Sequence, residues 1–353
     1  MSAGSPVELG VAIVGAGIIG DDHARAIAAV PGLRVVALVD PSRARLAVVA
    51  RTLSERGQPA VAEFASLTDA LALPGVDLVA ICTPSGLHVS LAEQAIAAGK
   101  HVLIEKPLDV DLDRARRFSA IALAAADRGI VVSVVSQHRF DDASVRVDAA
   151  IASGEFGRLT SGVASIAWWR PQSYYDSADW RGTWQLDGGG AAMNQGIHTI
   201  DLLLRYLGRP TLISARTALL AHTGIEVEDT LVATVEFESG ALGLIHATTA
   251  AYPGVSASLA IYGSSGSAVI VNDALTFFRT SLTEGETDPA AAQPVGGPGR
   301  GHGAQYADLL DAIRRHRPPR VTVDDALLAL ATVRALYDSA ASGETVDFAR
   351  VLD

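Results

Sequence analysis

The chain has 353 residues and is poor in cysteine and in basic side chains. Its one cysteine, Cys82, cannot form an intrachain disulfide or a cysteine-based metal site, which excludes a disulfide-stapled secreted scaffold and favours a reducing compartment. The 28 Lys and Arg face 39 Asp and Glu, a net charge of −11, whereas contacts with nucleic-acid phosphates require a basic surface. We therefore expect a cytoplasmic protein with no nucleic-acid partner.

Apolar runs of membrane-spanning length are also missing, although the mean hydropathy is +0.28. The stretch 239–272 has no charged residue, but Thr248, Thr249, Pro253 and a turn at 263–266 divide it into pieces of strand length. Near the N-terminus, glycines interrupt the first apolar run and no basic residue precedes it, unlike in a signal peptide. We expect no membrane segment and no export signal.

Residues 1–135 alternate short apolar runs with longer segments of helical spacing. Apolar strands separated by helices are typical of a parallel sheet covered on both faces, so we expect a doubly wound α/β domain of the Rossmann type. The strands are expected at 11–14, 33–39, 76–81, 101–104 and 130–135, and the helices at 18–30, 43–56, 88–98 and 111–128.

Residues 136–353 have a different pattern, with consecutive strands and few helices between them. Around 231–237, apolar residues alternate with polar ones, as in an antiparallel sheet with one buried face. We expect an α+β domain, and it stays open whether its last helix packs on the first domain. The strands are expected at 159–170, 212–220, 230–238, 241–249, 258–262 and 275–279, the helices at 142–153, from about Asn194 to before Gly208, at 304–316 and at 323–342, and a long loop at 284–304.

A GxGxxG pattern follows the first expected strand and opens the first expected helix. Gly15, Gly17 and Gly20 allow a tight turn, close approach of a pyrophosphate and close packing of the helix. Ile18 and Ile19 lie in the first turn of that helix, whose backbone amides can donate to phosphate. In this context the pattern predicts dinucleotide binding.

Asp40 ends the second expected strand, 23 residues after Gly17. A carboxylate at this point accepts hydrogen bonds from the adenosine ribose hydroxyls and repels a 2′-phosphate, which favours NAD over NADP. Arg43 and Arg45 lie close by in sequence. They can soften this preference, or they are solvated charges in the next helix.

Lys106 follows the strand expected at 101–104, at the sheet edge that borders the ligand crevice in open α/β sheets. Beside a positively charged nicotinamide, a partly desolvated lysine has a lowered pKa and can exchange a proton with a substrate hydroxyl. On position alone, an ordinary exposed lysine such as Lys100 is an equal alternative.

Four motifs together resemble the Gfo/Idh/MocA oxidoreductase family over essentially the whole chain. They are the glycine turn, Thr83-Pro84 with His88 after it, the triplet Glu105-Lys106-Pro107, and the segment from Gly188 to Asp201. The resemblance implies an N-terminal Rossmann domain, a C-terminal domain with a large, mostly antiparallel sheet, and nicotinamide-dependent oxidation or reduction of sugars and cyclitols. It also implies catalytic roles for Lys106 and His198 and a cofactor contact by Thr83, Pro84, His88 and Glu105.

One position departs from the family pattern. Many members have aspartate four residues before the histidine, where this chain has Asn194. In a helix, Asn194 and His198 share a face, and Asp201 lies on much the same side. An amide can orient a hydroxyl but cannot exchange a proton at neutral pH, so proton transfer falls to Lys106 or His198. Which of the two is the base stays open.

All four tryptophans lie between residues 168 and 184 of an otherwise aromatic-poor chain. Flat rings with arginines suit a sugar site, so we expect Arg170, Trp180 and Arg181 near the substrate. Trp168 and Trp169 point to opposite faces of an expected strand, so at least one of them packs in a core or an interface. The histidines and carboxylates show no metal-ligand spacing, and we expect no metal.

The sequence therefore predicts an NAD-dependent dehydrogenase acting on a secondary alcohol of a sugar, a sugar derivative or a cyclitol. The alternatives are a keto-sugar or nucleotide-sugar reductase, an enzyme that recycles NAD while cleaving a glycoside, and a non-catalytic dinucleotide sensor. An open antiparallel sheet exposes one face, for which Ile166, Val232 and Ile245 are candidate residues. Burying such a face favours a homodimer or homotetramer.

Overall fold

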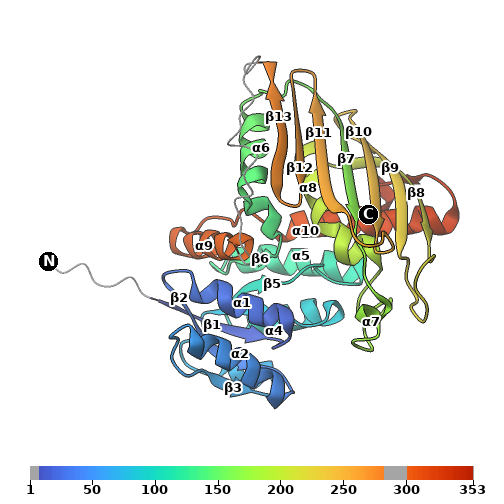
Figure 1. The fold of residues 1–353 in the computed structure, drawn as a ribbon. Helices are drawn as coiled ribbons and strands as arrows, with labels where there is room; N and C mark the ends of the chain where they lie inside the picture. Colours follow the sequence, from blue (N-terminus) through green and yellow to red (C-terminus); the bar gives the residue numbers. More distant parts are fainter. Residues whose placement is uncertain (1–7, 282–299, 353) are drawn as a thin grey trace. The chain divides into compact units, whose positions relative to one another are not determined.

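The computed structural model describes residues 8–281 and 300–352 (Figure 1). The chain divides into two compact units, Met1–Gln137 with Gly297–Asp324, and His138–Gly296 with Asp325–Asp353. The expected domain boundary after residue 135 stays a prediction. Most of the loop expected at 284–304 lies outside the described residues. Within the described ranges, none of the helices combines the length and the apolar character that crossing a bilayer requires.

The first unit contains a sheet of six parallel strands in the order β3-β2-β1-β4-β5-β6. Most side chains of its central strands are buried, which is why these strands read as nearly continuous apolar runs. Their bounds are β1 (Leu9–Val14), β2 (Leu33–Val39), β3 (Ala62–Phe64), β4 (Leu78–Ile81), β5 (His101–Ile104) and β6 (Val132–Val134). The order reverses direction between β1 and β4, and open α/β sheets bind ligands at such a point.

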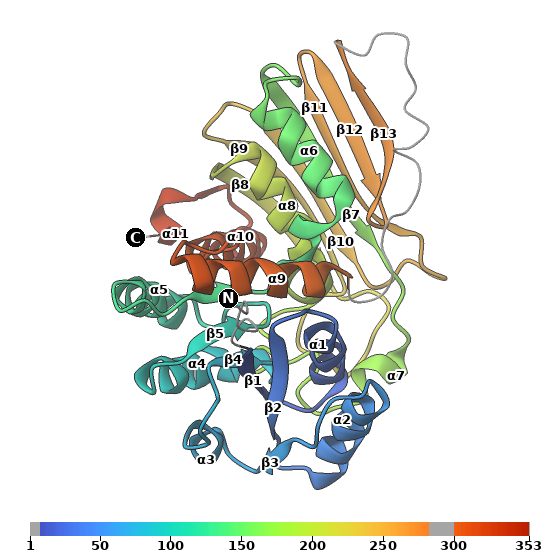
Figure 2. The ribbon, with the colours of Figure 1, turned by 90° about the vertical axis from the view of Figure 1, so that its left-hand side faces the viewer.

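Helices cover both faces of this sheet, with α1 and α2 on one side and α4 and α5 on the other (Figure 2). Their bounds are α1 (Ile18–Ala28), α2 (Arg43–Glu55), α3 (Leu67–Leu71), α4 (His88–Ala97) and α5 (Leu112–Ala126). From the far end of the sequence, α9 (Arg300–Arg315) contacts α1, and its Tyr306, Leu309 and Leu310 join the buried core around Ile27. The expected doubly wound α/β fold is confirmed.

The second unit contains a sheet of eight strands in the order β13-β12-β11-β7-β10-β9-β8-β14. Every neighbouring pair is antiparallel except β7 and β10, so the expectation of a large, mostly antiparallel sheet is confirmed. The strand bounds are β7 (Leu159–Ala167), β8 (Pro210–Ala218), β9 (Thr230–Phe237), β10 (Leu242–Thr248), β11 (Ser256–Gly263), β12 (Gly266–Val271), β13 (Ala274–Thr280) and β14 (Val346–Asp347). The helices are α6 (Asp142–Ala152), α7 (Gln172–Tyr175), α8 (Ile197–Leu207), α10 (Val323–Ser342) and α11 (Ala349–Leu352).

One face of this sheet is covered by α6 and α8 (Figure 2). Ile166 and Ile245 lie on that covered face, with 0% and 2% of their surface exposed, so their expected place on the open face is wrong. Side chains alternate between the two faces along each strand, so Ile166 and Ile245 point to the helix-covered face while Val163 and Leu244 point to the open face. Val232 does lie on the open face and is 50% exposed.

Candidate functional site

In the first unit, the carboxyl edge of the sheet gathers the residues expected to bind a cofactor. Gly15 follows β1, Asp40 follows β2, Thr83 lies two residues after β4, and Glu105 and Lys106 follow β5. Because parallel strands end at the same edge of a sheet, these residues belong to one border of it, next to the reversal between β1 and β4.

The glycine turn is shaped by contacts that only glycine permits. Gly15 has a φ of +98°, and a Cβ there would lie 2.5 Å from the carbonyl oxygen of Cys82. A Cβ on Gly20 would lie 2.0 Å from the carbonyl oxygen of Gly15, so α1 begins directly against the turn. A Cβ on Gly17 would meet nothing within 4 Å. The backbone around Gly17 is therefore open to close approach, as a pyrophosphate requires.

Two apolar side chains flank this open backbone. Ile18 is 79% exposed and Ile19 is 42% exposed at the N-terminus of α1. Large exposed apolar side chains beside a helix N-terminus fit a site that a bound ligand covers.

Asp40 is buried and is oriented by the glycine turn. Its Oδ2 accepts from the Ala16 N–H at 2.9 Å, and its Oδ1 accepts from the Ser42 N–H at 2.8 Å. Each carboxylate oxygen keeps a further lone pair with which it can accept a ribose hydroxyl. Arg43 is exposed, and the Arg45 guanidinium lies 3.9 Å from Oδ2, mostly in solvent.

His88 connects two loops at this edge. Its Nδ1 lies 2.7 Å from the Pro107 carbonyl oxygen, and its Nε2 lies 2.9 Å from the Thr83 carbonyl oxygen. The ring is buried, and this burial lowers the pKa of His88, although both carbonyls favour the protonated form. The Thr83 hydroxyl is buried and has no hydrogen-bond partner in the described part of the chain, so it is an open polar contact for a ligand.

Glu105 is the centre of a buried polar cluster. Its Oε1 lies 2.9 Å from Nε2 of His23 and 3.4 Å from Nε2 of His302, and Nδ1 of His23 lies 2.6 Å from the Tyr306 hydroxyl. Burial raises the pKa of Glu105, but the hydrogen bonds of the two histidines outweigh burial and hold this pKa well below its usual value. The ionised carboxylate accepts from the Lys106 N–H at 3.0 Å and thereby fixes the backbone that carries the lysine.

A nicotinamide dinucleotide fits this edge. The open backbone at Gly17 can receive the pyrophosphate, Asp40 can hold the adenosine ribose, and the unpartnered Thr83 hydroxyl provides a further polar contact. Lys106 follows β5, the neighbour of β4 in the sheet, and the reacting end of such a cofactor lies on this side of the crevice in doubly wound folds.

In the second unit, a buried carboxylate holds the glycine run that precedes His198. Glu228 accepts from the N–H groups of Gly190 and Ala192, each at 2.9 Å, and from the Tyr337 hydroxyl at 3.1 Å. A Cβ on Gly190 would lie 1.7 Å from the Glu228 carbonyl oxygen, which explains the need for glycine. Burial raises the pKa of Glu228 to about 7 against these hydrogen bonds.

A π-helical turn, Ala192–Gly196, contains Asn194, and α8 begins directly after it at Ile197. The helix expected from about Asn194 to before Gly208 is present, but its first turn is π-helical and not α-helical. A π turn has a wider spacing than an α-helix, so the four-residue rule for a shared face does not apply between Asn194 and His198. Such turns are frequent at functional sites.

Asn194 is oriented by the buried Asp187. The Asn194 Nδ2 donates to Oδ1 of Asp187 at 2.8 Å, and Oδ2 of Asp187 accepts from the Gly182 N–H at 2.9 Å. These contacts direct the nitrogen end of the amide toward Asp187 and its carbonyl end away from it. The carboxylate that many family members have at position 194 is thus replaced by an amide that contacts a carboxylate.

His198 packs edge-on against His138, with 5.1 Å between the ring centroids. Nδ1 of His138 lies 2.8 Å from Oδ2 of Asp141 and 2.9 Å from Oδ1 of Asp273. Burial lowers the pKa of His138, but the two carboxylates outweigh burial and raise this pKa to about 9. The candidate catalytic imidazole therefore lies beside a positively charged one.

Asp201 has a structural partner. Arg139 donates from Nε and Nη2 to both carboxylate oxygens of Asp201, at 2.7 and 2.6 Å, and its Nη1 lies 3.0 Å from Asp325. Arg139 and Asp201 are both buried. Their ion pair ties the helix of His198 to the segment before α6.

The three expected substrate residues, Arg170, Trp180 and Arg181, meet around Tyr174. The Arg170 guanidinium carbon lies 5.1 Å from the Tyr174 ring centroid, and that of Arg181 lies 4.3 Å from the same centroid and 4.6 Å from the Trp180 ring. The Arg170 guanidinium carbon also lies 5.1 Å from the Trp168 ring centroid. The structure thus brings these side chains together within the second unit.

Several residues of these clusters carry no signal in the sequence. Only Gln195 belongs to a motif, the segment from Gly188 to Asp201, and nothing in that motif singles it out. The partners of all these residues come from distant segments or from neighbouring loops. The residues are His23, His138, Tyr174, Asp187, Gln195, Glu228, His302 and Tyr306. Two of the groups, His23 with Glu105 and His302, and His138 with Asp141 and Asp273, are also close enough together to hold a metal ion. Their hydrogen bonds and ion pairs account for both groups, and the absence of a metal stays a prediction.

Both halves of the sequence match known families. Residues 9–135 match the model described as an oxidoreductase family with an NAD-binding Rossmann fold, and residues 144–269 match the GFO/IDH/MocA C-terminal domain. The glycine cradle, the reversal in strand order and these matches define an oxidoreductase that binds a nicotinamide cofactor. The chain belongs to the Gfo/Idh/MocA family, which confirms the resemblance.

Individual relatives cover most of the chain. The WlbA dehydrogenase from Bordetella pertussis, solved in complex with NADH and UDP-GlcNAcA, is 31% identical, with a TM-score of 0.84 over 97% of this chain and 98% of that one. The scyllo-inositol 2-dehydrogenase (NAD(+)) of Bacillus subtilis (strain 168) is 28% identical over 73% of this chain and 72% of its own length. The 1,5-anhydro-D-fructose reductase of Ensifer adhaerens is 28% identical over 84% of this chain and 89% of its own length.

Proposed function

We propose that the protein is an NAD-dependent dehydrogenase that oxidises a secondary alcohol of a sugar, a sugar derivative or a cyclitol. The observation that carries this proposal is the sheet edge where the open glycine turn, the buried Asp40 and Lys106 follow three strands of one parallel sheet. The relatives support the substrate class, since their names include an inositol, an anhydro sugar and a UDP-linked sugar. When bound, the NAD would accept a hydride from the carbinol carbon.

Lys106 or His198 takes the proton of the substrate hydroxyl in this proposal. Glu105 fixes the backbone of Lys106, and the glycine run held by Glu228 leads to the turn before His198. Asn194, whose side-chain nitrogen donates to Asp187, positions a substrate hydroxyl by hydrogen bonding in this proposal. The other expected contacts, His88 and Pro84, support the cofactor by shaping the loop after β4.

The test uses the two lysines of the chain, Lys106 and Lys100. A panel of sugars, glycosides and inositols is screened by NADH absorbance, and the best substrate is used for kinetics. We expect Lys106→Met to lower kcat by about 10²–10⁴-fold with little change in the Kd for NAD, because general acid–base catalysis contributes that much. Lys100→Met serves as the matched control and keeps the parental rate. An unchanged kcat in the Lys106 variant removes this residue from the mechanism.

NAD rather than NADP is the proposed cofactor. Asp40 is buried at the end of β2 with its carboxylate fixed by two backbone N–H groups, and a 2′-phosphate there would meet a negative charge. We expect a clearly lower KM for NAD than for NADP. Asp40→Asn narrows the difference between the KM values for NAD and NADP, because a neutral amide no longer repels the 2′-phosphate. A parental preference for NADP refutes this assignment.

We also propose that the protein self-associates in the cytoplasm, as a dimer or tetramer, through the open face of the second sheet. Val232, Leu242 and Leu244 on that face are between 50% and 58% exposed, and burying such a patch favours association. The single cysteine supports a reducing compartment. Light scattering of the parent and of Leu244→Lys tests the surface; a monomeric parent would end the proposal.

A further inference from the structure

Two arginines near Tyr174 have no carboxylate partner among the described residues. Arg170 has no side-chain hydrogen bond there, and its Nε is buried without a partner. Arg181 donates to the Ser177 hydroxyl at 3.1 Å and to the Tyr174 hydroxyl at 2.8 Å. Both guanidinium groups lie beside the Tyr174 ring, and neither is ion-paired in the described part of the chain, so both are available to an anion.

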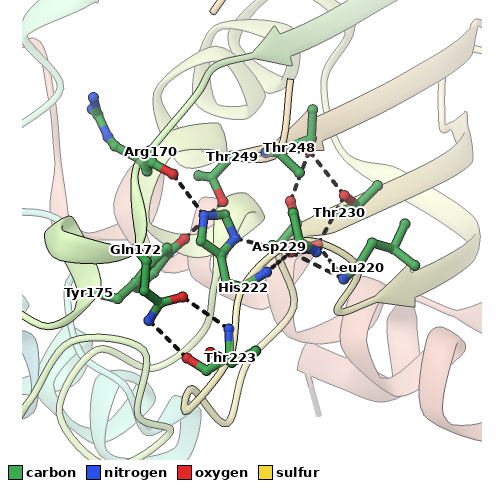
Figure 3. Close-up of polar contacts among 12 residues, drawn as sticks. Arg170, Gln172, Tyr175, Leu220, His222, Thr223, Asp229, Thr230, Thr248 and Thr249 are labelled. Carbon is green, nitrogen blue, oxygen red and sulfur yellow. Dashed lines mark hydrogen bonds and ion pairs between the residues drawn. The ribbon is translucent and has the colours of Figure 1, made fainter. Parts of the chain in front are cut away.

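The backbone of Arg170 is fixed from the opposite side. His222 donates from Nε2 to the Arg170 carbonyl oxygen at 2.7 Å, and its Nδ1 lies 3.0 Å from Oδ2 of Asp229. Asp229 is fully buried and also accepts from backbone N–H groups of Leu220 and Ala221. Figure 3 shows the Arg170 side chain extending away from this network. The backbone is thus anchored, while the guanidinium projects away from its anchor.

Gln195 adds a hydrogen-bond acceptor to the same cluster. It is 5% exposed, its Nε2 donates to the Tyr174 hydroxyl at 3.2 Å, and its Oε1 is buried without a partner in the described chain. The Tyr174 oxygen accepts from Arg181 and Gln195, which leaves its own proton to donate. The cluster therefore offers many donors and one acceptor, as an anionic group next to a hydroxyl requires.

The buried carboxylate of Asp187 lies near these groups. Asp187 acts on the pKa of Tyr174, which burial raises, and its oxygens accept from Gly182 and Asn194. Arg181 and Arg170 act in the opposite direction and lower the pKa of Tyr174, so both positive charges reach its hydroxyl. Gln195 directly follows Asn194 in the π turn, so the cluster borders the residue proposed to orient the reacting hydroxyl.

We propose that Arg170, Arg181 and Tyr174 bind a carboxylate of the substrate, which is therefore an acidic sugar such as a uronic acid. Gln195 accepts a neighbouring hydroxyl of the same sugar. The inference rests on the proposed function for its connection to oxidation, whereas the binding itself does not require turnover. Arginine pairs a carboxylate through two parallel N–H groups, a geometry that lysine cannot reproduce.

The experiment measures binding to the full-length protein saturated with NADH. Calorimetry gives the Kd of D-glucuronate, D-galacturonate and D-mannuronate, each against its neutral parent hexose, with glucose 6-phosphate as the phosphate arm. We expect the best uronate to bind about 10- to 100-fold more tightly than its parent, since hydrogen bonds to charged groups contribute that much. Arg170→Gln and Arg181→Gln each remove most of this difference. Arg350→Gln, at an exposed arginine of α11, keeps it.

Folding is checked in each variant by the Kd for NADH, and Arg170→Lys and Arg181→Lys retain the charge if a glutamine variant fails to fold. Equal binding of uronates and neutral parents overturns the inference, and tighter binding of glucose 6-phosphate than of every uronate overturns the choice of a carboxylate. If neutral sugars yield NADH and the arginine variants do not change this rate, the proposed function stays intact and this inference is removed. If uronate binding depends on the arginines but no substrate yields NADH, this inference stands and the proposed function is removed.

Discussion

Glu228 makes the stability of the second unit depend on pH. Its side chain is buried, and its pKa rises from the usual 4.5 to about 7. Between these two values the folded protein keeps a proton that the unfolded chain releases. The free energy of unfolding therefore falls as the pH rises from 4.5 to 7 and loses no more above 7. At about 1.4 kcal/mol for each pH unit, the loss is roughly 3 kcal/mol.

Glu228→Gln tests this magnitude, because glutamine has the shape of the protonated acid and cannot ionise. Urea unfolding followed by circular dichroism, at pH 4.5, 5.5, 6.5 and 8, gives the free energy of unfolding by linear extrapolation. We expect the parent to lose about 3 kcal/mol relative to this variant between pH 4.5 and 8. Other titrating groups are common to both proteins and cancel in the difference.

Glu236→Gln is the matched control, since Glu236 lies on β9 with its side chain exposed. Its curve is expected to stay parallel to that of the parent. A Glu228→Gln curve that also runs parallel to the parent at every pH would show that no proton is retained at this carboxylate. The account of how the glycine run is held would then fail.

Three further predictions concern the two candidate sites. In Gly17→Ala the added methyl meets no atom, so we expect the free energy of unfolding to change by less than about 0.5 kcal/mol while NAD binding weakens. Gly15→Ala is expected to lower the free energy of unfolding by about 2 kcal/mol or more, because its methyl would collide with the backbone. Equal losses for the two variants in chemical denaturation would contradict this. Asn194→Asp brings a second carboxylate about 2.8 Å from the first, so one of them stays protonated near neutral pH, and the pH profile of kcat/KM gains a step; an unaltered profile argues against it. Asp273→Asn removes one partner of His138, so the pKa of this histidine falls below about 9 in an NMR titration. The stability from His138 is complete below pH 6.5 and is lost as the pH rises through the folded pKa, so this loss moves to lower pH in the variant.

The fold was predictable where a residue pattern is local. Buried parallel strands read as apolar runs, and the alternation on β9 gave its buried face correctly. The three-residue β3 was missed because so short a segment has no period. The strand β12 was missed because its first three residues, Gly266, Ser267 and Ala268, are small and show no apolar alternation. Ile166 was assigned to the wrong face because alternation alone does not reveal which side the helices cover.

The candidate site divides in the same way. The sequence could single out Gly15, Gly17 and Asp40 as candidates, because each is recognised by its position relative to a strand nearby in the sequence. Glu228 was not found, because it reaches the glycine run from 38 residues away. The π turn at Asn194 was also not expected, since an extra residue in one helical turn leaves no compositional trace.

The return of α9 to the first sheet has a consequence for how the protein is made. The buried core under α1 includes Tyr306, Leu309 and Leu310, and the ring nitrogen of His23 contacts the Tyr306 hydroxyl across 283 positions of the chain. A ribosome has therefore translated most of the message before the nucleotide-binding half can complete its interior. Until then this half exposes an apolar surface on α1, so its folding is tied to synthesis of the other half.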